Sequence, residues 1–484
     1  MGSVYSDGNQ ANNIVIDSNQ SLYSSTRRGG IGTSGTSISS TRYSINPETQ
    51  WPGWDPAANT FDFVMSIDAG TGLLVMGDPF YDESSADQGQ IWITNYDGNS
   101  WKRITGIWNQ STKFGTSVAI GSGKIAVGAP ETTYGGASNA GGVAIYDYQG
   151  TYERVIYPQF NVADGKFGDR QALAIGNGIV AAGQSKLIDV LDGESAYGLT
   201  VQYNRLDTGA VIRVLQPIDW HNEHMDGMNF TPRNETKMGE SVAYGHGRWF
   251  MGDSYGDFVA QESGGISSWK NRTVTPFPND DFTYLRTYLP SEIGPNYKRA
   301  DHYDAQTTAE NYQQKAGAKI RVGSGCVATG LEGLSSLYSY GRRGGIFVYD
   351  ISSGELITEI KLPNDYTTST SGAFGTYDAG SGLRGDFDIG CGYVVGASNA
   401  DDDPNGTTVV GVWTTTGELV EIFSLGPVNN TPHVVRQVKI ADGYVFICGN
   451  ITSPSSKGFV YRFTLPSNID VVTESILSPY INLP

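Results

Sequence analysis

The sequence predicts an all-β fold, and three observations support this prediction. Glycine accounts for 63 of the 484 residues, which indicates many tight turns. Only 17% of the residues are charged, so the long charged side chains typical of helices and coiled coils are scarce. Short apolar segments joined by glycine turns recur along most of the chain. We therefore expect one large repetitive domain.

The repeated unit is clearest between residues 114 and 147. Two strand-like segments follow Phe114-Gly115 and end at Gly128-Ala129-Pro130, and a third runs from Gly141 to Asp147. The same plan occurs seven times, and the glycine that ends the second segment marks each copy: Gly77, Gly128, Gly183, Gly252, Gly330, Gly396 and Gly449. Fourth strands can be assigned after most copies. The sequence therefore predicts a seven-bladed β-propeller of four-stranded antiparallel blades.

The Phe-Gly and Gly-Ala-Pro motifs of this copy resemble the FG-GAP repeat of integrin α-subunit propellers. The resemblance covers roughly residues 60 to 465, although the second motif is Gly-Asp-Pro in the first copy and Gly-Ala-Ser in the sixth. Inner strands crowd together around a propeller axis, so small residues let their backbones approach. The glycines also supply positive φ at the strand turns, and a Phe at the start of each blade packs between sheets.

The chain divides into three parts. Residues 1–52 form an extended, low-complexity N-terminal arm, whose composition cannot bury enough apolar surface to fold alone. Residues 53–466 form the propeller, with an insertion at 271–315 between blades four and five. Residues 467–484 form a C-terminal segment. Two alternatives are open for the last strand of blade seven, which either residues 470–477 or the arm supplies.

The insertion is the most informative irregularity, because long loops inside compact folds usually have a function. It is rich in proline and tyrosine, and tyrosine offers a large contact area at low entropic cost. A protein interface and a sugar-stacking surface both fit this composition. The candidate interaction residues are Tyr284, Tyr288, Tyr297, Tyr303 and Tyr312.

Residues 401–406 contain the pattern Asp-x-Asp-x-Asn-Gly, which forms the first half of a calcium-binding loop. Asp401, Asp403 and Asn405 would supply the oxygen ligands. The second half is missing, because Val412 occupies the position at which glutamate completes such a loop. A calcium site and an acidic hairpin loop are therefore both open, and we expect no other cofactor.

Thirty-two basic against 50 acidic residues give a formal net charge of −18, which disfavours binding to nucleic acid. No segment has the apolar length of a membrane span or a signal peptide, so we expect no membrane insertion. No nucleophile, acid and base constellation is evident. We therefore expect a protein that is not an enzyme.

These features together resemble, in style, a structural protein of a tailed bacteriophage. The resemblance implies a non-enzymatic virion component of the capsid, neck, tail or fibre, located in the virion. Residues 1–50 would dock on other virion proteins, and the propeller would present a binding surface to a host glycan or receptor.

Two alternative functions are open. One is a calcium-dependent adhesin with an integrin-like propeller, which would be extracellular or at the cell surface. The other is a hydrolase or lyase that acts on polysaccharide in the propeller channel. The second alternative requires carboxylates clustered at the axis.

Overall fold

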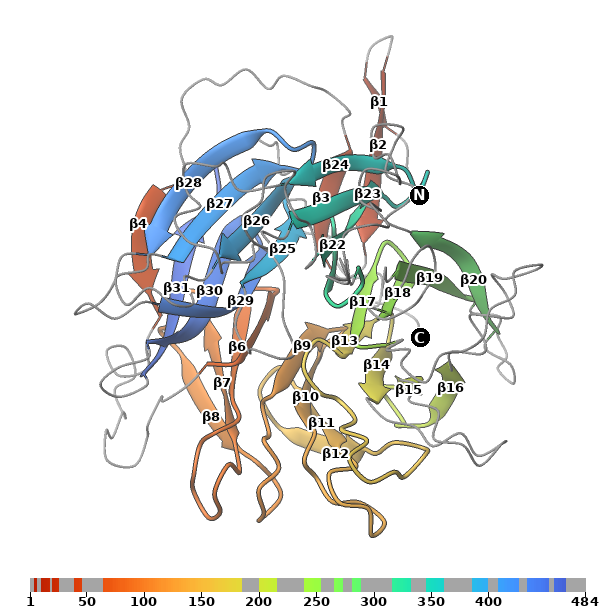
Figure 1. Cartoon of the computed structure of the whole chain (residues 1–484), viewed down its shortest axis with the longest axis vertical. Coiled ribbons are helices and arrows are strands. Elements are labelled where there is room, and N and C mark those ends of the chain that lie inside the picture. The colour runs from red at the N-terminus through yellow and green to blue at the C-terminus, as the bar shows by residue number, and fades with distance from the viewer. Residues whose placement is uncertain are drawn as a thin grey trace, which may run out of the picture.

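Seven four-stranded sheets surround a common axis in the computed structural model (Figure 1). The structure describes residues 4–6, 10–17, 20–25, 39–45, 64–184, 200–215, 239–253, 265–272, 281–288, 316–331, 345–360, 385–398, 408–425, 433–451 and 457–466. These residues form strands and turns but no helix, so none of them belongs to a helix that could cross a membrane. The predicted all-β, seven-bladed propeller with four-stranded antiparallel blades is confirmed.

Each blade pairs its strands in antiparallel order, and chain order is followed within the first six blades. Blade one contains β5 (Ser66–Gly70), β6 (Leu73–Asp78), β7 (Gln90–Asn95) and β8 (Trp101–Thr105). Blade two contains β9 (Ser117–Gly121), β10 (Lys124–Ala129), β11 (Gly142–Asp147) and β12 (Tyr152–Ile156). Blade three contains β13 (Leu173–Gly176), β14 (Ile179–Gln184), β15 (Thr200–Arg205) and β16 (Val211–Leu215).

Blades four to six follow the same plan. Blade four contains β17 (Ser241–Gly245), β18 (Arg248–Asp253), β19 (Gly265–Arg272) and β20 (Asp281–Tyr288). Blade five contains β21 (Ile320–Gly323), β22 (Cys326–Leu331), β23 (Gly345–Asp350) and β24 (Leu356–Ile360). Blade six contains β25 (Asp386–Gly390), β26 (Tyr393–Ser398), β27 (Thr408–Thr414) and β28 (Leu419–Leu425). Strand β20 comes from within residues 271–315, so part of the range predicted as an insertion belongs to blade four itself.

Blade seven combines the last strands of the propeller with one strand of the N-terminal arm. Its first three strands are β29 (His433–Ala441), β30 (Tyr444–Ile451) and β31 (Lys457–Thr464), and its fourth is β4 (Ser39–Ser44) from the N-terminal arm. The arm is therefore the alternative that closes the ring, whereas residues 467–484, which include the other candidate strand, lie outside the described residues. The arm also forms a separate three-stranded sheet of β1 (Val4–Ser6), β2 (Gln10–Asp17) and β3 (Gln20–Ser25).

Tyr43 of β4 and the following Ile45 hold the arm in place. The Ile45 backbone N–H donates to the Val460 carbonyl at 2.9 Å, and the Ile45 side chain is fully buried between blades seven and one. The Arg462 guanidinium lies 4.4 Å from the ring centre of Tyr43 and pairs with Asp97 of blade one at 2.5 Å. The arm strand is thus attached to both of the blades that it joins.

The first strand of each blade lies next to the axis and contacts the first strands of both neighbouring blades. The circle closes from β29 to β5. Buried apolar residues form seven clusters, and each cluster combines strands of two adjacent blades. The core of the molecule is therefore a set of interfaces between blades.

The second-strand glycines allow these interfaces to close. A Cβ atom on Gly77 would lie 2.0 Å from the Gly115 carbonyl oxygen of the next blade, and one on Gly128 would lie 2.0 Å from the Gly168 oxygen. Gly115 and Gly168 follow the buried Phe114 and Phe167. The two halves of the repeated motif thus meet across each of these interfaces.

The turns between first and second strands are alike in all seven blades. Each contains two residues with positive φ, of which the second is always glycine, as a type I′ hairpin requires. The first residue has φ between 49° and 54° in every case: Thr71, Ser122, Asn177, His246, Ser324, Cys391 and Asp442. In four of these turns the side chain accepts an N–H of a neighbouring turn, as when Ser324 Oγ accepts the Gly392 N–H at 2.7 Å.

We expect Gly77→Ala to lower the free energy of unfolding by more than about 2 kcal/mol, because the new Cβ would overlap backbone atoms of blade two. Gly70→Ala is the matched control in the same blade, since its Cβ would meet only Ile120 Cγ2, at 4.0 Å. Its effect should stay below about 1 kcal/mol. Urea unfolding measures both values, and equal effects of the two substitutions would contradict the close-approach argument.

Candidate functional site

The tyrosines predicted as interaction residues lie in two kinds of place. Tyr284 and Tyr288 belong to β20, where Tyr288 is buried and packs against Phe250 and Tyr349. Tyr284 packs edge-on against Trp269. Tyr297, Tyr303 and Tyr312 lie outside the described residues. The binding role of these five tyrosines stays a prediction.

The calcium loop is in the same position. Asp401, Asp403 and Asn405 lie outside the described residues. Within the part of the chain that the structure describes, no three His, Cys, Asp or Glu side chains are placed to hold a metal ion together.

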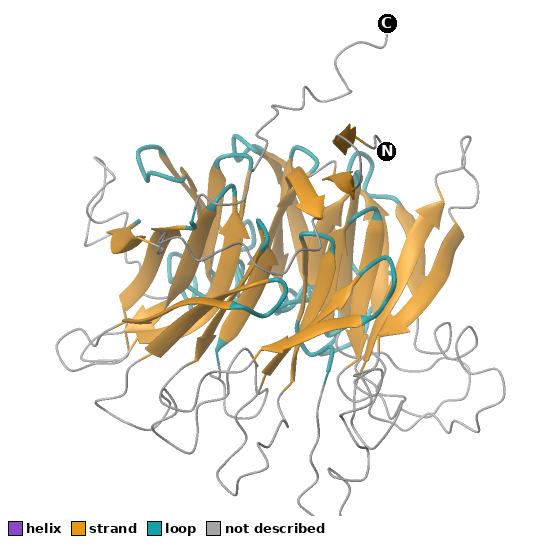
Figure 2. Cartoon of the chain, turned by 90° about the horizontal axis from the view of Figure 1, so that it is seen from above, coloured by secondary structure: helices purple, strands orange, loops and turns teal. Residues whose placement is uncertain are grey.

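The two faces of the ring differ in their connections (Figure 2). The hairpins between first and second strands form one face, which we call the turn face. In blades one to three, the described segments 79–89, 106–116, 130–141 and 157–172 join second to third strands and one blade to the next on the opposite face, the loop face. On the loop face, the segments entering blades two and three bond to a loop of the preceding blade. Lys113 and Phe114 donate to the Asp87 and Gln88 carbonyls, and Lys166 and Phe167 donate to the Asn139 and Ala140 carbonyls.

Aromatic side chains gather on the loop face around blade two. The Tyr134 and Tyr157 rings are stacked with centres 3.9 Å apart and planes 4° apart. Trp108 Nε1 donates to the Tyr157 hydroxyl at 3.4 Å, and both of these rings approach Gly142. Tyr134 is 39% exposed. We call Trp108, Tyr134 and Tyr157 the aromatic platform.

Buried glutamines fix the backbone beneath this platform. Gln88 Nε2 donates to the carbonyls of Gly106 and Trp108 at 2.8 and 3.0 Å. Gln202 Nε2 donates to the Tyr157 carbonyl at 3.0 Å, and its Oε1 accepts the Gln159 N–H. Both glutamines are 3% exposed. These hydrogen bonds therefore hold the backbone of the platform in one arrangement, because breaking them would leave buried polar groups unpaired.

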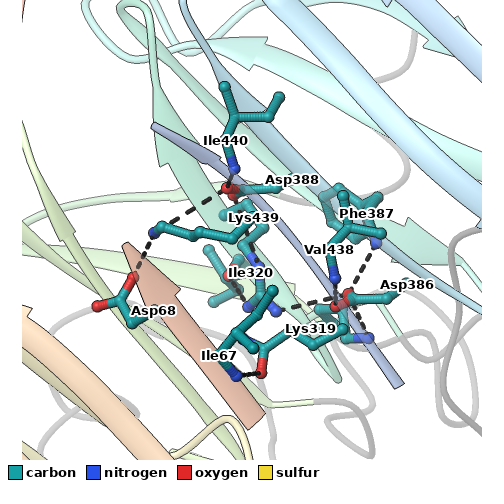
Figure 3. A network of polar contacts seen from close by, with 12 residues as sticks. Ile67, Asp68, Lys319, Ile320, Asp386, Phe387, Asp388, Val438, Lys439 and Ile440 are labelled. Carbon is teal, nitrogen blue, oxygen red and sulfur yellow. Dashed lines mark hydrogen bonds and ion pairs between the residues drawn. The ribbon is translucent and has the colours of Figure 1, made fainter. Parts of the chain in front are cut away.

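A second polar feature lies on the first strands of blades five, six, seven and one (Figure 3). Lys319 pairs with Asp386 at 2.5 Å, and Arg321 lies 3.5 Å from Asp386 and 3.7 Å from Asp388. Lys439 lies 3.0 Å from Asp68 and 4.0 Å from Asp388. Cations and carboxylates thus alternate from blade to blade, and we call these six residues the charge chain.

The carboxylates of the charge chain also bind backbone. Asp386 Oδ2 accepts the Val438 N–H and Asp388 Oδ2 accepts the Ile440 N–H, both at 2.7 Å. Asp68 Oδ2 accepts the Ile120 N–H at 2.7 Å. Each acid therefore joins its own first strand to the first strand of the following blade.

In this network burial disfavours the charged form of each group, whereas pairing with an opposite charge favours it. Burial lowers the pKa of Lys319 to about 8, although the Asp386 carboxylate offsets part of that effect. Burial raises the pKa of Asp388, against the influence of Lys439 and Arg321. Burial also works to lower the pKa of Lys439, but Asp68 and Asp388 outweigh it and the net shift is upward.

The carboxylates required by the alternative of catalysis in the channel are thus present at the axis. However, Asp68, Asp386 and Asp388 each accept backbone N–H groups and each lie beside a cation. Asp386 is fully buried. The described geometry therefore gives these acids a role in joining blades, since a general acid or base must reach its substrate.

Sequence reasoning missed both the platform and the charge chain. Aligning the seven copies could have found the charge chain, because two equivalent positions carry small or uncharged polar residues in some blades and charged residues in others: Ser66 and Asp68, Ser117 and Ala119, Ala172 and Ala174, Ser241 and Ala243, Lys319 and Arg321, Asp386 and Asp388, and Gln437 and Lys439. No such signal marks the platform, whose three residues come from loops of different length.

Comparisons with known proteins found similar solved structures alone. No family model and no curated protein sequence matches the chain. Among solved structures, the β-propeller domain of the Trilobed protease from Pyrococcus furiosus has a TM-score of 0.45 and 10% identity, over 85% of this chain and 99% of that one. The Pyrococcus horikoshii acylaminoacyl peptidase has a TM-score of 0.46 and 12% identity, over 85% of this chain and 54% of the peptidase.

The Chaetomium thermophilum protein Raptor is also similar, with a TM-score of 0.44 and 9% identity over 84% of this chain and 29% of Raptor. At these identities the likeness is one of fold alone. The chain spans about half the length of the peptidase and less of Raptor.

These findings correct two expectations. The similar structures include parts of two peptidases, so a non-enzymatic virion component and a chain that is not an enzyme are no longer the expectation. Both expectations rest on features that enzymes and structural proteins share, because one fold can carry many functions and catalytic residues need not form a local sequence motif. The contacts expected between residues 1–50 and other proteins stay predictions.

We expect Asp386→Asn to lower the free energy of unfolding by about 3 to 5 kcal/mol, because it leaves the Lys319 ammonium buried without its counter-ion. Adding Lys319→Met should restore at least half of the loss, since no buried charge is then left unpaired. Urea unfolding of the two single variants and the double variant forms the cycle. Additive effects would show that the two side chains are not coupled.

We expect all three cysteines to resist thiol reagents in the folded protein. Cys326, Cys391 and Cys448 are free and buried. Burial raises the pKa of Cys326 to about 12 and raises the pKa of the other two as well, so little thiolate forms at neutral pH. Titration with a chromogenic disulfide should detect no thiol before unfolding and three in concentrated urea. Rapid reaction of the native protein would contradict this packing.

Proposed function

We propose that the chain is a polypeptide-binding propeller that holds an unfolded or extended polypeptide against its loop face. The observation that supports this proposal is the aromatic platform, which combines a stacked tyrosine pair with a tryptophan on a fixed backbone. Tyrosine and tryptophan are enriched where proteins bind one another, because they offer large apolar area together with a polar group.

The rest of the loop face suits the same role. Phe80 and Ile107 are exposed on neighbouring loops of blades one and two, at 38% and 40%. A polypeptide segment that crosses from the platform toward blade one would therefore meet further apolar contacts. Since the loops are already ordered by backbone bonds and buried glutamines, little conformational entropy would be lost from the protein on binding.

We also propose that the blades are of the FG-GAP type. Only the second copy carries both motifs in full, but the packing supports the assignment. The glycine after Phe114 and the glycine after Phe167 each touch the second-strand glycine of the preceding blade, Gly77 or Gly128. Gly183 and Gly239 make the same contact one interface further on.

Binding can be tested with reduced, alkylated α-lactalbumin, a permanently unfolded polypeptide, labelled for fluorescence anisotropy. We expect saturable binding, and Tyr134→Ala should weaken it about tenfold, because an exposed interface tyrosine is removed without disturbing the core. Tyr152→Ala is the matched control. Tyr152 is an exposed tyrosine of the same blade, at 49%, but it lies on the outer strand β12.

The proposal would be contradicted by two results. One is the absence of any binding to the unfolded probe while circular dichroism shows intact protein. The other is binding that Tyr134→Ala and Tyr152→Ala weaken equally. The same mixtures, followed by mass spectrometry for fragments of the probe, show whether the chain also cleaves what it binds.

A further inference from the structure

Cations that lie over aromatic rings in this protein also pair with a carboxylate. Arg462 lies over Tyr43 and pairs with Asp97. Arg103 lies 5.3 Å from the Tyr81 ring centre and pairs with Glu83 at 3.3 Å.

Lys113 repeats the arrangement, since it lies 5.7 Å from the Phe80 ring centre and pairs with Glu131 at 2.7 Å. Among the described residues, these three sites contain every cation found over a ring. In each one the cation lies over an aromatic ring, which attracts its charge, and a carboxylate pairs with it.

The aromatic platform has the ring and the acid of such a site but not the cation. One face of the Tyr134 ring stacks on Tyr157, so its exposed area belongs to the other face and the edge. The hairpin that carries Tyr134 is paired at Ala137, and the next carbonyl, that of Ser138, accepts the Asp164 N–H at 2.9 Å. Asp164 is therefore a neighbour of this hairpin.

The Asp164 carboxylate is exposed and accepts one hydrogen bond, from Asn139 Nδ2 at 2.9 Å. Lys166 lies two residues further along the loop, but no ion pair joins it to Asp164 in the described part of the chain. A charged acceptor and a free ring face thus lie on adjacent segments of one ordered surface.

We propose that Tyr134 and Asp164 form a subsite for an arginine side chain of the bound polypeptide. The guanidinium would stack on the outer face of Tyr134 and donate hydrogen bonds to the Asp164 carboxylate, which repeats the arrangement of Arg462 with Tyr43 and Asp97. The formal net charge of −18 favours the approach of such a segment. This inference rests on the proposed function, because it names which residue of a bound polypeptide the platform selects.

The test uses two labelled peptides of glycine, serine and proline that differ at a few positions, which carry arginine in one peptide and citrulline in the other. Citrulline has nearly the same shape as arginine but no charge. We expect the arginine peptide to bind about tenfold more tightly, and the preference should decrease as salt is added. Asp164→Asn should abolish the preference, and Tyr134→Leu should reduce it.

Glu355→Gln and Tyr152→Leu are the matched controls, since they remove an exposed acid and an exposed tyrosine away from the platform. Both should keep the full preference for arginine. A preference that survives Asp164→Asn, or that Glu355→Gln reduces equally, would overturn the subsite.

The two proposals fail differently. Equal binding of the arginine and citrulline peptides, together with tight binding of unfolded α-lactalbumin that requires Tyr134, would overturn the arginine subsite and keep the polypeptide-binding function. Absence of binding to either peptide and to unfolded α-lactalbumin would overturn both. Platform-dependent binding of the arginine peptide alone would support the subsite.

Discussion

The close contact between a second-strand glycine and the carbonyl group that opens the next blade sets the spacing of blades one to five. The contact leaves no room for a Cβ atom at Gly77, Gly128 or Gly252. It also buries a carbonyl oxygen, which would be costly without a donor. Serine hydroxyls at the start of the first strands supply that donor in blades one, two and four, at 2.8, 2.6 and 2.5 Å. In each of these blades the glycine therefore permits the close approach, and the serine donates a hydrogen bond to the carbonyl oxygen that this approach buries.

Charged side chains join blades five, six, seven and one. Where blades one, two and four start their first strands with serine, blades five and six have Lys319 and Asp386. These buried groups lose hydration, and their pairing offsets that loss only while each has its partner. The alternation of positive and negative blades means that a shifted pairing would place like charges together. The charge chain thus adds a penalty against wrong association of blades, which apolar contacts alone do not provide.

The fold could be predicted from sequence because its determinants are local and repeat seven times. The type I′ turns and the glycines at strand ends lie within about twenty residues of each other in every copy. Ring closure could not be predicted in this way, because β4 and β31 are more than 400 residues apart and neither has a distinctive pattern. The platform was also out of reach. Tyr134 and Tyr157 become neighbours only after the loop within blade two and the segment that leaves this blade have been placed.

The loop face inherits its rigidity from the blade interfaces. The segment that carries Trp108 continues directly to Phe114-Gly115, and the segment that carries Tyr157 continues to Phe167-Gly168. Each segment is therefore fixed at one end by the glycine contact and in its middle by a buried glutamine. Exposed side chains on such a segment can change without altering the ring, whereas Trp108 also packs against Phe114 at the interface between blades one and two. The glycine contacts thus position the proposed binding surface, and the exposed side chains of the loops determine what that surface binds.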